Sequence, residues 1–170
     1  MEFKEISVNE LNGNVFNMIG KKWMLVTAAK SEQEVNTMTA SWGGLGIMWG
    51  KPVAFIFVRP QRYTKEFIEA SDTVSLTFFD ESYRKMLSYM GSVSGKDEDK
   101  IKTAGLKVIF DDKTPYFEEA EVVLKTKKLY AQDMGAECLI DKEINDKWYP
   151  ADDWHTMYVC EIERVLVRNH

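Results

Sequence analysis

The sequence predicts a mainly β protein with a few short helices, folded as a closed or split β-barrel. Two observations predict this fold class. Seven runs have the length and composition of strands, whereas only three short stretches carry the signals of a helix. Most gaps between the strands are too short, or of the wrong pattern, for the ~10–15-residue helices that alternate with strands in a doubly wound sheet.

The expected strands are apolar or alternating runs bounded by charged or turn residues. The run Thr73–Phe79 alternates, with Val74, Leu76 and Phe78 on one face of the strand. The run Pro52–Val58 is continuously apolar, as in a buried strand. The seven predicted strands are residues 23–29, 37–42, 52–58, 73–79, 122–130, 137–144 and 156–167.

The expected helices are short, and local signals mark their ends. Thr64 stands at the N-cap of the first helix and Asp80 at the N-cap of the second. Gly105 follows the third, at a position where helices commonly end. The three predicted helices are residues 64–70, 81–90 and 97–104.

Length and composition indicate one soluble domain over residues 1–170. The hydrophobic fraction of 45% and the charged fraction of 29% are ordinary for a globular protein. The net charge of −5 argues against a nucleic-acid surface. No apolar run is long enough for a membrane span or a signal peptide, and two scattered cysteines suit a reducing compartment, so we expect a cytoplasmic protein. The cysteines and histidines are not spaced as zinc ligands, so we expect no metal site.

The glycines of residues 43–50 are expected to form a turn between two strands. They do not encode a P-loop, because Pro52 follows Gly50 and Lys51 where the motif needs a hydroxyl residue. Nor do they encode a dinucleotide fingerprint, because Trp49 stands where that motif needs glycine. Hydrolase chemistry is also disfavoured, since the chain has no nucleophile elbow.

Three segments could together hold a phosphorylated, flat aromatic ligand. The first is Asn36–Trp42, where hydroxyl side chains alternate and Ala40 and Ser41 allow a ligand close to the backbone. An isoalloxazine ring needs an apolar surface together with hydrogen bonds at its edge. Taken alone, the same pattern also fits a half-buried strand with Trp42 in the core, and by itself it favours that alternative.

The second segment is Arg59–Lys65, between a strand and a helix. Unpaired N–H groups at a helix start favour an anion, and Arg62 adds a planar fork of donors that matches phosphate. The alternative is a surface turn with two solvated arginines. The third segment is Ser94–Lys100, where Ser94, Gly95 and two lysines precede a helix. Its alternative is a capped helix with mixed surface charge.

The sequences NTMTASWGG, RPQRYTKEFIE and SGKDEDK, in this order, resemble the flavin reductase-like, FMN-binding split-barrel family, near its flavoredoxin members. The resemblance spans about residues 23–165. It implies a split barrel that dimerises and holds FMN, rather than FAD, near the dimer interface. The cofactor-binding residues that it implies are Met38, Thr39, Ala40, Ser41, Trp42, Arg59, Arg62, Tyr63, Thr64, Ser94, Lys96 and Lys100.

The only candidate catalytic residue is His155. Reductases of this family carry a histidine on the nicotinamide side of the flavin, five residues before a glycine. Here Cys160 stands at the glycine position, so the role of His155 stays open between the active site and a structural position. We expect Cys160 to be a small core residue rather than a redox thiol.

The resemblance implies an FMN-dependent oxidoreductase, and three classes of function remain. The first is an NAD(P)H-dependent reductase of flavins or small acceptors, although the sequence shows no nicotinamide site. The second is an electron carrier with a redox protein partner. The third is an FMN-binding or storage protein without turnover. The pyridoxamine phosphate oxidase type shares the barrel, but its motifs match less well.

Overall fold

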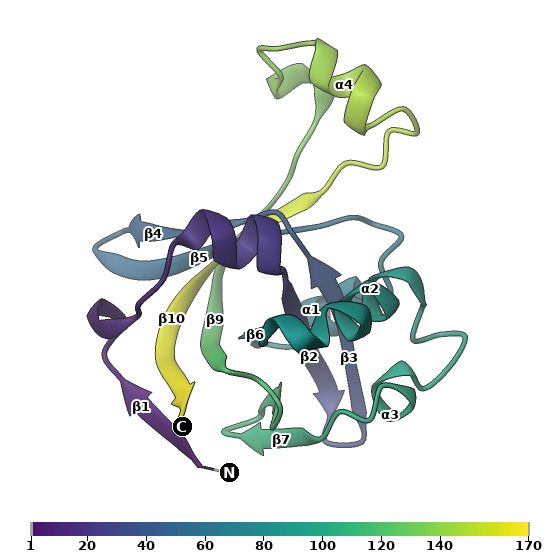
Figure 1. Cartoon of the computed structure of the whole chain (residues 1–170). Helices are drawn as coiled ribbons and strands as arrows, with labels where there is room; N and C mark the ends of the chain where they lie inside the picture. The colour runs from purple at the N-terminus through teal and green to yellow at the C-terminus, as the bar shows by residue number, and fades with distance from the viewer. Residues whose placement is uncertain (1, 170) are drawn as a thin grey trace.

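A computed structural model describes residues 2–169 of the chain and shows a split β-barrel (Figure 1). One antiparallel sheet runs in the order β3-β2-β6-β9-β10-β5-β4, and β1 also pairs with β10. A separate pair, β7 and β8, lies at one end of the barrel. The strands of the main sheet are β1 Phe3–Ile6, β2 Met24–Ser31, β3 Glu34–Ala40, β4 Gly44–Met48, β5 Lys51–Val58, β6 Thr73–Phe78, β9 Val122–Asp133 and β10 Thr156–Arg168.

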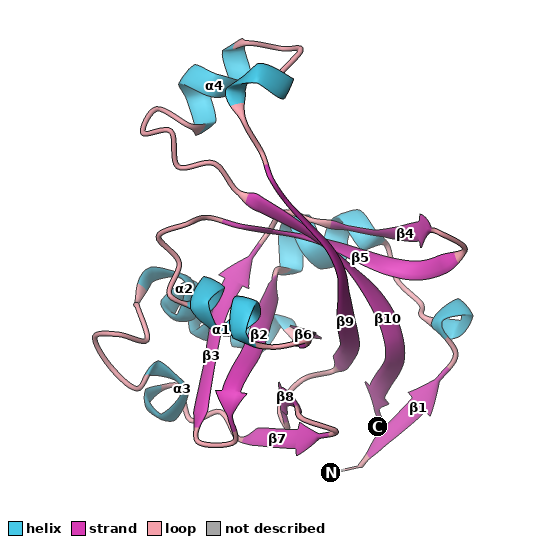
Figure 2. Cartoon of the chain, turned by 180° about the vertical axis from the view of Figure 1, so that it is seen from behind, coloured by secondary structure: helices cyan, strands magenta, loops and turns pink. Residues whose placement is uncertain are grey.

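The helices are short and lie outside the barrel wall (Figure 2). The α-helices are α1 Thr64–Ala70, α2 Arg84–Ser92, α3 Lys100–Thr103 and α4 Glu143–Trp148. The remaining helical segments are η1 Val8–Glu10, η2 Asn17–Lys22, η3 Glu81–Tyr83 and η4 Ala136–Cys138, of which η2 is a π-helix. The mainly β fold class predicted from the sequence is confirmed.

One predicted strand is wrong. Residues 137–144 contain no strand, but the end of η4 and the start of α4. The carboxylate of Asp141 accepts a hydrogen bond from the backbone N–H of Glu143 at 3.1 Å and so supports the first turn of α4. Pairing between β9 and β10 already stops at the Asp133–Thr156 pair, so this segment has no neighbouring strand to join.

The glycine run was predicted as a turn, and this is wrong for most of it. Residues 44–48 form β4, which pairs with β5, and Gly44 and Gly46 lie against the ring of Phe55. The turn is confined to Trp49 and Gly50, whose φ angles are 52° and 69°. Two successive positive φ angles give the tight hairpin turn that matches the twist of paired strands.

Three further strands, β1 and the pair formed by β7 and β8, were not predicted from the sequence. Strands β7 Val108–Asp111 and β8 Thr114–Phe117 are four residues each and join through Asp112 and Lys113. Both turn residues have positive φ, at 48° and 65°, without the glycine or asparagine that usually marks such a turn. The hairpin was therefore not recognisable from local turn chemistry.

The helix boundaries are partly confirmed. Asp80 caps η3 as predicted, because its carboxylate accepts from the backbone N–H of Ser82 at 2.9 Å. Gly105 follows the third helix with φ of 70°, but that helix begins at Lys100 and Asp99 caps it. Thr64 lies inside α1 rather than at its N-cap, so its hydroxyl is free to serve another contact.

The interior of the barrel is apolar and holds Cys160. Its side chain is fully buried in an apolar cluster that also contains Tyr158 and Ile162 of β10 and Leu124 of β9. Burial raises the pKa of the Cys160 thiol to about 11, which keeps it protonated and unreactive near neutral pH. The prediction that Cys160 is a core residue is confirmed.

The segment between β9 and β10, residues 134–155, projects from the barrel as an arm that carries α4 (Figures 1 and 2). We call this segment the arm. Within residues 2–169, its Ile140 is the most exposed large apolar side chain, at 99%. Among residues 2–169, no helix has the length and apolar character needed to span a bilayer.

Candidate functional site

A cavity of about 600 Å³ opens where the barrel, the turn before α1, the loop after α2 and the arm meet. We call it the basic cavity. A smaller hollow of about 270 Å³, which we call the aromatic chamber, adjoins it. Both share Met38, Arg59, Arg62 and Trp148 in their walls, so they are two parts of one recess.

The two parts differ in their linings. The basic cavity is lined by Asn36, Met38, Arg59, Gln61, Arg62, Tyr63, Thr64, Ser92, Val93, Ser94, Gly95, Lys100, Lys147, Trp148, Pro150, Ala151 and Asp153. The aromatic chamber is lined by Met38, Thr39, Ala40, Ser41, Trp42, Phe57, Arg59, Arg62, Trp148 and His155. The residues predicted from the sequence therefore line this recess, with the exception of Lys96.

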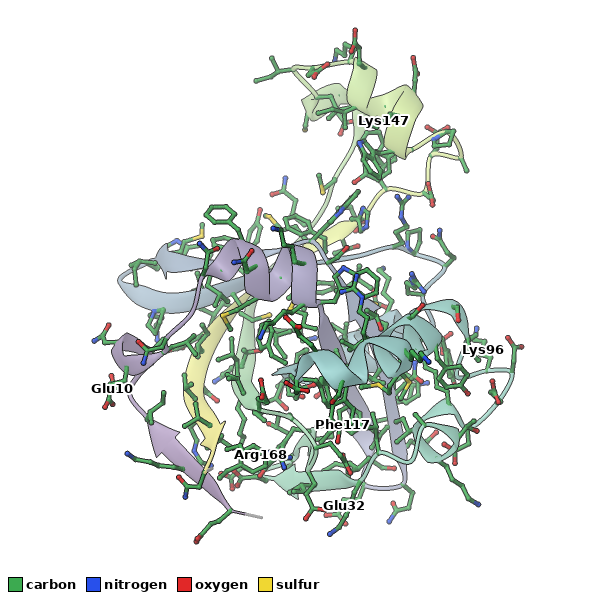
Figure 3. All side chains as sticks on the ribbon, viewed as in Figure 1. Glu10, Glu32, Lys96, Phe117, Lys147 and Arg168 are labelled. Carbon is green, nitrogen blue, oxygen red and sulfur yellow. The ribbon has the colours of Figure 1, made fainter. Side chains whose placement is uncertain are left out.

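Positive charge is concentrated in the basic cavity. Four cationic side chains, Arg59, Arg62, Lys100 and Lys147, line it, against one carboxylate, Asp153. Figure 3 labels Lys147, which the arm contributes. The chain as a whole carries a net charge of −5, so the lining of the basic cavity has the opposite sign to the net charge of the chain. A cleft lined by one sign of charge attracts ligands of the opposite sign, so the recess favours an anion.

Arg62 has most of its donors available. Its Nη1 donates to the carbonyl of Gly91 at 2.8 Å, and this is the one hydrogen bond that its guanidinium makes within residues 2–169. Burial, and then the charge of Arg59, lower the pKa of Arg62, but a guanidinium stays protonated in proteins. The remaining N–H groups of its planar fork suit a phosphate or a carboxylate.

Arg59, by contrast, ties the arm to the barrel. Its Nη1 donates to the carboxylate of Asp153 at 2.7 Å, and its Nη2 donates to the carbonyl of Trp148 at 3.0 Å. Gln61 donates to the same oxygen of Asp153 at 2.6 Å. The hydrogen bond from Gln61, followed by that from Arg59, lowers the pKa of Asp153 and favours its charged form.

A buried hydrogen bond joins two of the predicted segments. Nδ2 of Asn36, on β3, donates to the hydroxyl of Thr64, on α1, at 2.9 Å. The loop after α2 passes close to this pair, because a Cβ on Gly95 would stand only 2.2 Å from Oδ1 of Asn36. Glycine at position 95 therefore lets the third segment close against the first, which places Ser94 at the cavity wall.

The two lysines of the third segment lie in different places. Lys96 forms an ion pair with Glu66 at 3.1 Å and lies over the ring of Tyr63, outside the lining of the recess. Lys100 is 4% exposed, and its ammonium donates to the carbonyls of Met90 and Val93, each at 2.9 Å. Burial, and then the charge of Arg62, lower the pKa of Lys100 to about 8, so it is mostly charged near neutral pH.

The aromatic chamber is formed by residues of β3, β5 and the arm. Trp42 packs edge-on against Trp148 of the arm at 5.0 Å between ring centroids, and lies 5.1 Å from the ring of His155. The hydroxyl of Thr39 donates to the carbonyl of Leu87 at 2.5 Å, which fixes the end of β3 against α2. Such walls suit a flat apolar group with polar atoms at its edge.

His155 lies between the chamber and the base of the arm. It is 7% exposed, and its Nδ1 lies 2.7 Å from the hydroxyl of Tyr149. Burial, and then the charge of Arg59, lower the pKa of His155 to about 4. Its imidazole is therefore neutral near neutral pH, and it cannot act there as a proton donor of ordinary strength.

Sequence reasoning missed the wall that the arm contributes. Trp148, Tyr149 and Asp153 were assigned no role, because residues 137–144 resembled a strand and the segment after them carried no known motif. A signal was present in the run Trp148–Trp154, which concentrates three aromatic rings in seven residues.

The chain matches the family described as flavin reductase-like domain over residues 17–170. It belongs to this family. Among solved structures, flavoredoxin of Methanosarcina acetivorans superposes with a TM-score of 0.69 and is 21% identical over 94% of this chain and 75% of its own. Flavoredoxin of Desulfovibrio vulgaris gives 0.67 and 20%, over 99% and 78%. An NADH:FAD oxidoreductase of Streptomyces globisporus gives 0.64 and 15%, over 86% and 74%.

At these identities, the structural neighbours of this flavin reductase-like chain support the fold alone. No curated protein sequence matches it. The family assigned from the three sequence segments is confirmed, and the positions of the arm, Arg62 and His155 are properties of this chain's own geometry.

The depressed pKa of His155 predicts a loss of stability in mild acid. Between about pH 4 and pH 6.5 the unfolded chain binds more protons than the folded one, so the free energy of unfolding falls as the pH is lowered. From about pH 7 to about pH 5 the loss attributable to His155 is about 2 kcal/mol.

Urea unfolding of the wild type and of His155→Gln at a series of pH values measures this effect. The difference in unfolding free energy between the two proteins should shrink by about 2 kcal/mol as the pH falls from about 7 to about 5. His170 is present in both and serves as an internal control. Parallel stability curves would show that His155 is not buried as described.

Proposed function

We propose that this chain binds FMN in the recess and acts as an FMN-dependent oxidoreductase of the flavin reductase or flavoredoxin type. Hydride or electrons would pass from NAD(P)H or a protein donor, through FMN, to a flavin, a small acceptor or a redox partner. One observation carries the proposal: a cavity with four cations opens into a chamber walled by two tryptophans and a histidine. This matches a planar ring that bears an anionic tail.

The donor set fits the two ends of FMN. The phosphate would lie with Arg62, whose N–H groups are largely unused, and near the ammonium of Lys100. The isoalloxazine ring would lie in the chamber, along the strand end formed by Ala40 and Ser41 and beside Trp42. A diphosphate ligand such as FAD needs further space and further donors, and we propose FMN rather than FAD.

When bound, FMN would supply the hydride and electron chemistry of the site. The chain's own residues would bind, orient and shield it. Trp42 and Trp148, in edge-on contact, would cover one side of the ring. His155, neutral at working pH, would offer a hydrogen bond and not a proton. Within residues 2–169, the lining of the chamber includes no carboxylate.

We also infer that the chain forms a homodimer. Large apolar side chains are exposed on the arm and on the hairpin of β4 and β5, as they are at sites that pack against another protein. Ile140 on the arm is 99% exposed, and Ile47 and Trp49 on the hairpin are 75% and 57% exposed. In a homodimer, a second copy of the chain would cover these apolar side chains and pack against the projecting arm.

Anaerobic reduction tests the function. The FMN-loaded protein is mixed under argon with NADH, with NADPH or with a reduced ferredoxin, and the visible flavin absorbance is followed. Rapid bleaching by a nicotinamide supports a reductase, and bleaching by the protein donor alone supports an electron carrier. Flavin that resists every donor would contradict the oxidoreductase proposal and leave an FMN-storage protein.

Arg62→Ala should weaken FMN binding before it affects folding. Loss of one charge-assisted contact costs about 1.5–3 kcal/mol, or about 10- to 150-fold in the dissociation constant. Titration of flavin fluorescence measures the constant. Lys51→Ala removes the same charge from an exposed ion pair with Glu161 outside the recess and is the control. Equal affinity of the two folded variants for FMN would refute the phosphate role of Arg62.

A further inference from the structure

Tyr149 caps the C-terminal end of α4 and lies between the arm and Arg59 of the barrel. It is 3% exposed, and its ring stacks on Trp154 with centroids 3.9 Å apart and planes 17° apart. The guanidinium of Arg59 also lies over the Tyr149 ring, 5.0 Å from its centroid. The ring of His155 meets it edge-on at 5.5 Å. None of these ring contacts requires the hydroxyl, so they do not account for the presence of tyrosine rather than phenylalanine at this position.

The hydroxyl of Tyr149 makes one contact, and this contact sets the tautomer of His155. It lies 2.7 Å from Nδ1 of His155. Burial raises the pKa of Tyr149, so the phenol keeps its proton, and burial lowers the pKa of His155, so the imidazole is neutral. A phenol is a stronger acid than a neutral imidazole. It therefore donates to Nδ1, and the single ring proton of His155 lies on Nε2.

Nε2 is the ring nitrogen left for a ligand. Within residues 2–169 no hydrogen bond joins it to another group, and His155 forms part of the chamber wall beside Trp42. We propose that Tyr149 is a positioning residue that holds His155 in the Nε2–H tautomer, so that the imidazole donates a hydrogen bond to the planar ligand of the aromatic chamber. The identity of that ligand as an isoalloxazine ring rests on the proposed function; its carbonyl oxygens and ring nitrogens are the acceptors.

The hydroxyl can be removed without removing the ring. Tyr149→Phe keeps the ring that stacks on Trp154 and under Arg59, and it deletes only the donor to Nδ1. Tyr130→Phe is the matched control, because the hydroxyl of Tyr130 bonds to Gln132 on β9, away from the recess. Thermal unfolding of both variants verifies that each is folded before the two measurements below.

The first measurement needs no flavin. The chain has two histidines, His155 and His170, so nitrogen NMR of histidine-labelled protein gives two imidazole signals, and His155→Gln assigns them. Near neutral pH the wild type and Tyr130→Phe should show Nδ1 of His155 as an unprotonated acceptor and Nε2 as the protonated nitrogen. Tyr149→Phe should distribute the proton over both nitrogens. A proton on Nδ1 in the wild type, or no change in Tyr149→Phe, would overturn the proposal.

The second measurement separates ring from phosphate. Lumiflavin has the ring of FMN without the phosphate, and its dissociation constant is measured by quenching of flavin fluorescence. Tyr149→Phe should weaken lumiflavin binding about two- to tenfold, the effect of one neutral hydrogen bond, and Tyr130→Phe should not. Unchanged affinity in Tyr149→Phe, or no lumiflavin binding by the wild type, would overturn the donor role. A wild type that binds lumiflavin but does not bind FMN would instead count against the proposed function. The NMR result would still decide the tautomer of His155.

Discussion

The recess depends on the ion pair between Arg59 and Asp153. It joins the turn that follows β5 to the end of the arm, 94 residues further along the chain. Both side chains are 22% exposed, so the pair is partly shielded from solvent, and Gln61 and the carbonyl of Trp148 bond to it as well. Together with the contact between Trp42 and Trp148, this pair holds Lys147, Trp148 and Pro150 against the barrel as one wall of the recess.

The same pair sets the electrostatics of the site. Asp153 compensates the charge of Arg59, so Arg62, the buried Lys100 and Lys147 are the cations left to meet an anion. The proximity of these cations is unfavourable without a ligand. Burial, and then the charge of Arg59, lower the pKa of Arg62, and burial, and then the charge of Arg62, lower the pKa of Lys100. A bound phosphate would relieve this repulsion. The recess therefore suits an anionic ligand, because folding pairs one of its cations with Asp153 and leaves the others without a carboxylate partner among residues 2–169.

The sequence was sufficient for the barrel and for most of the recess. Strand patterns located six of the ten strands in residues 2–169. The chemistry of residues 38–42, 59–64 and 94–100 brought together side chains that, except for Lys96, the fold places in one recess. The arm was not predictable in this way, because its wall depends on the distant Arg59–Asp153 contact and not on a local pattern. Lys96 was a candidate through the family resemblance, and its pairing with Glu66 of α1 is visible only in the folded chain.

The central claim is that one recess, charged at one end and aromatic at the other, holds a yellow mononucleotide. Incubation of the purified protein with excess FMN, desalting and a visible absorption spectrum test it most directly, with FAD in a parallel sample. We expect one FMN to be retained by each chain, and much less FAD. A protein that stays colourless after FMN and desalting would contradict the account.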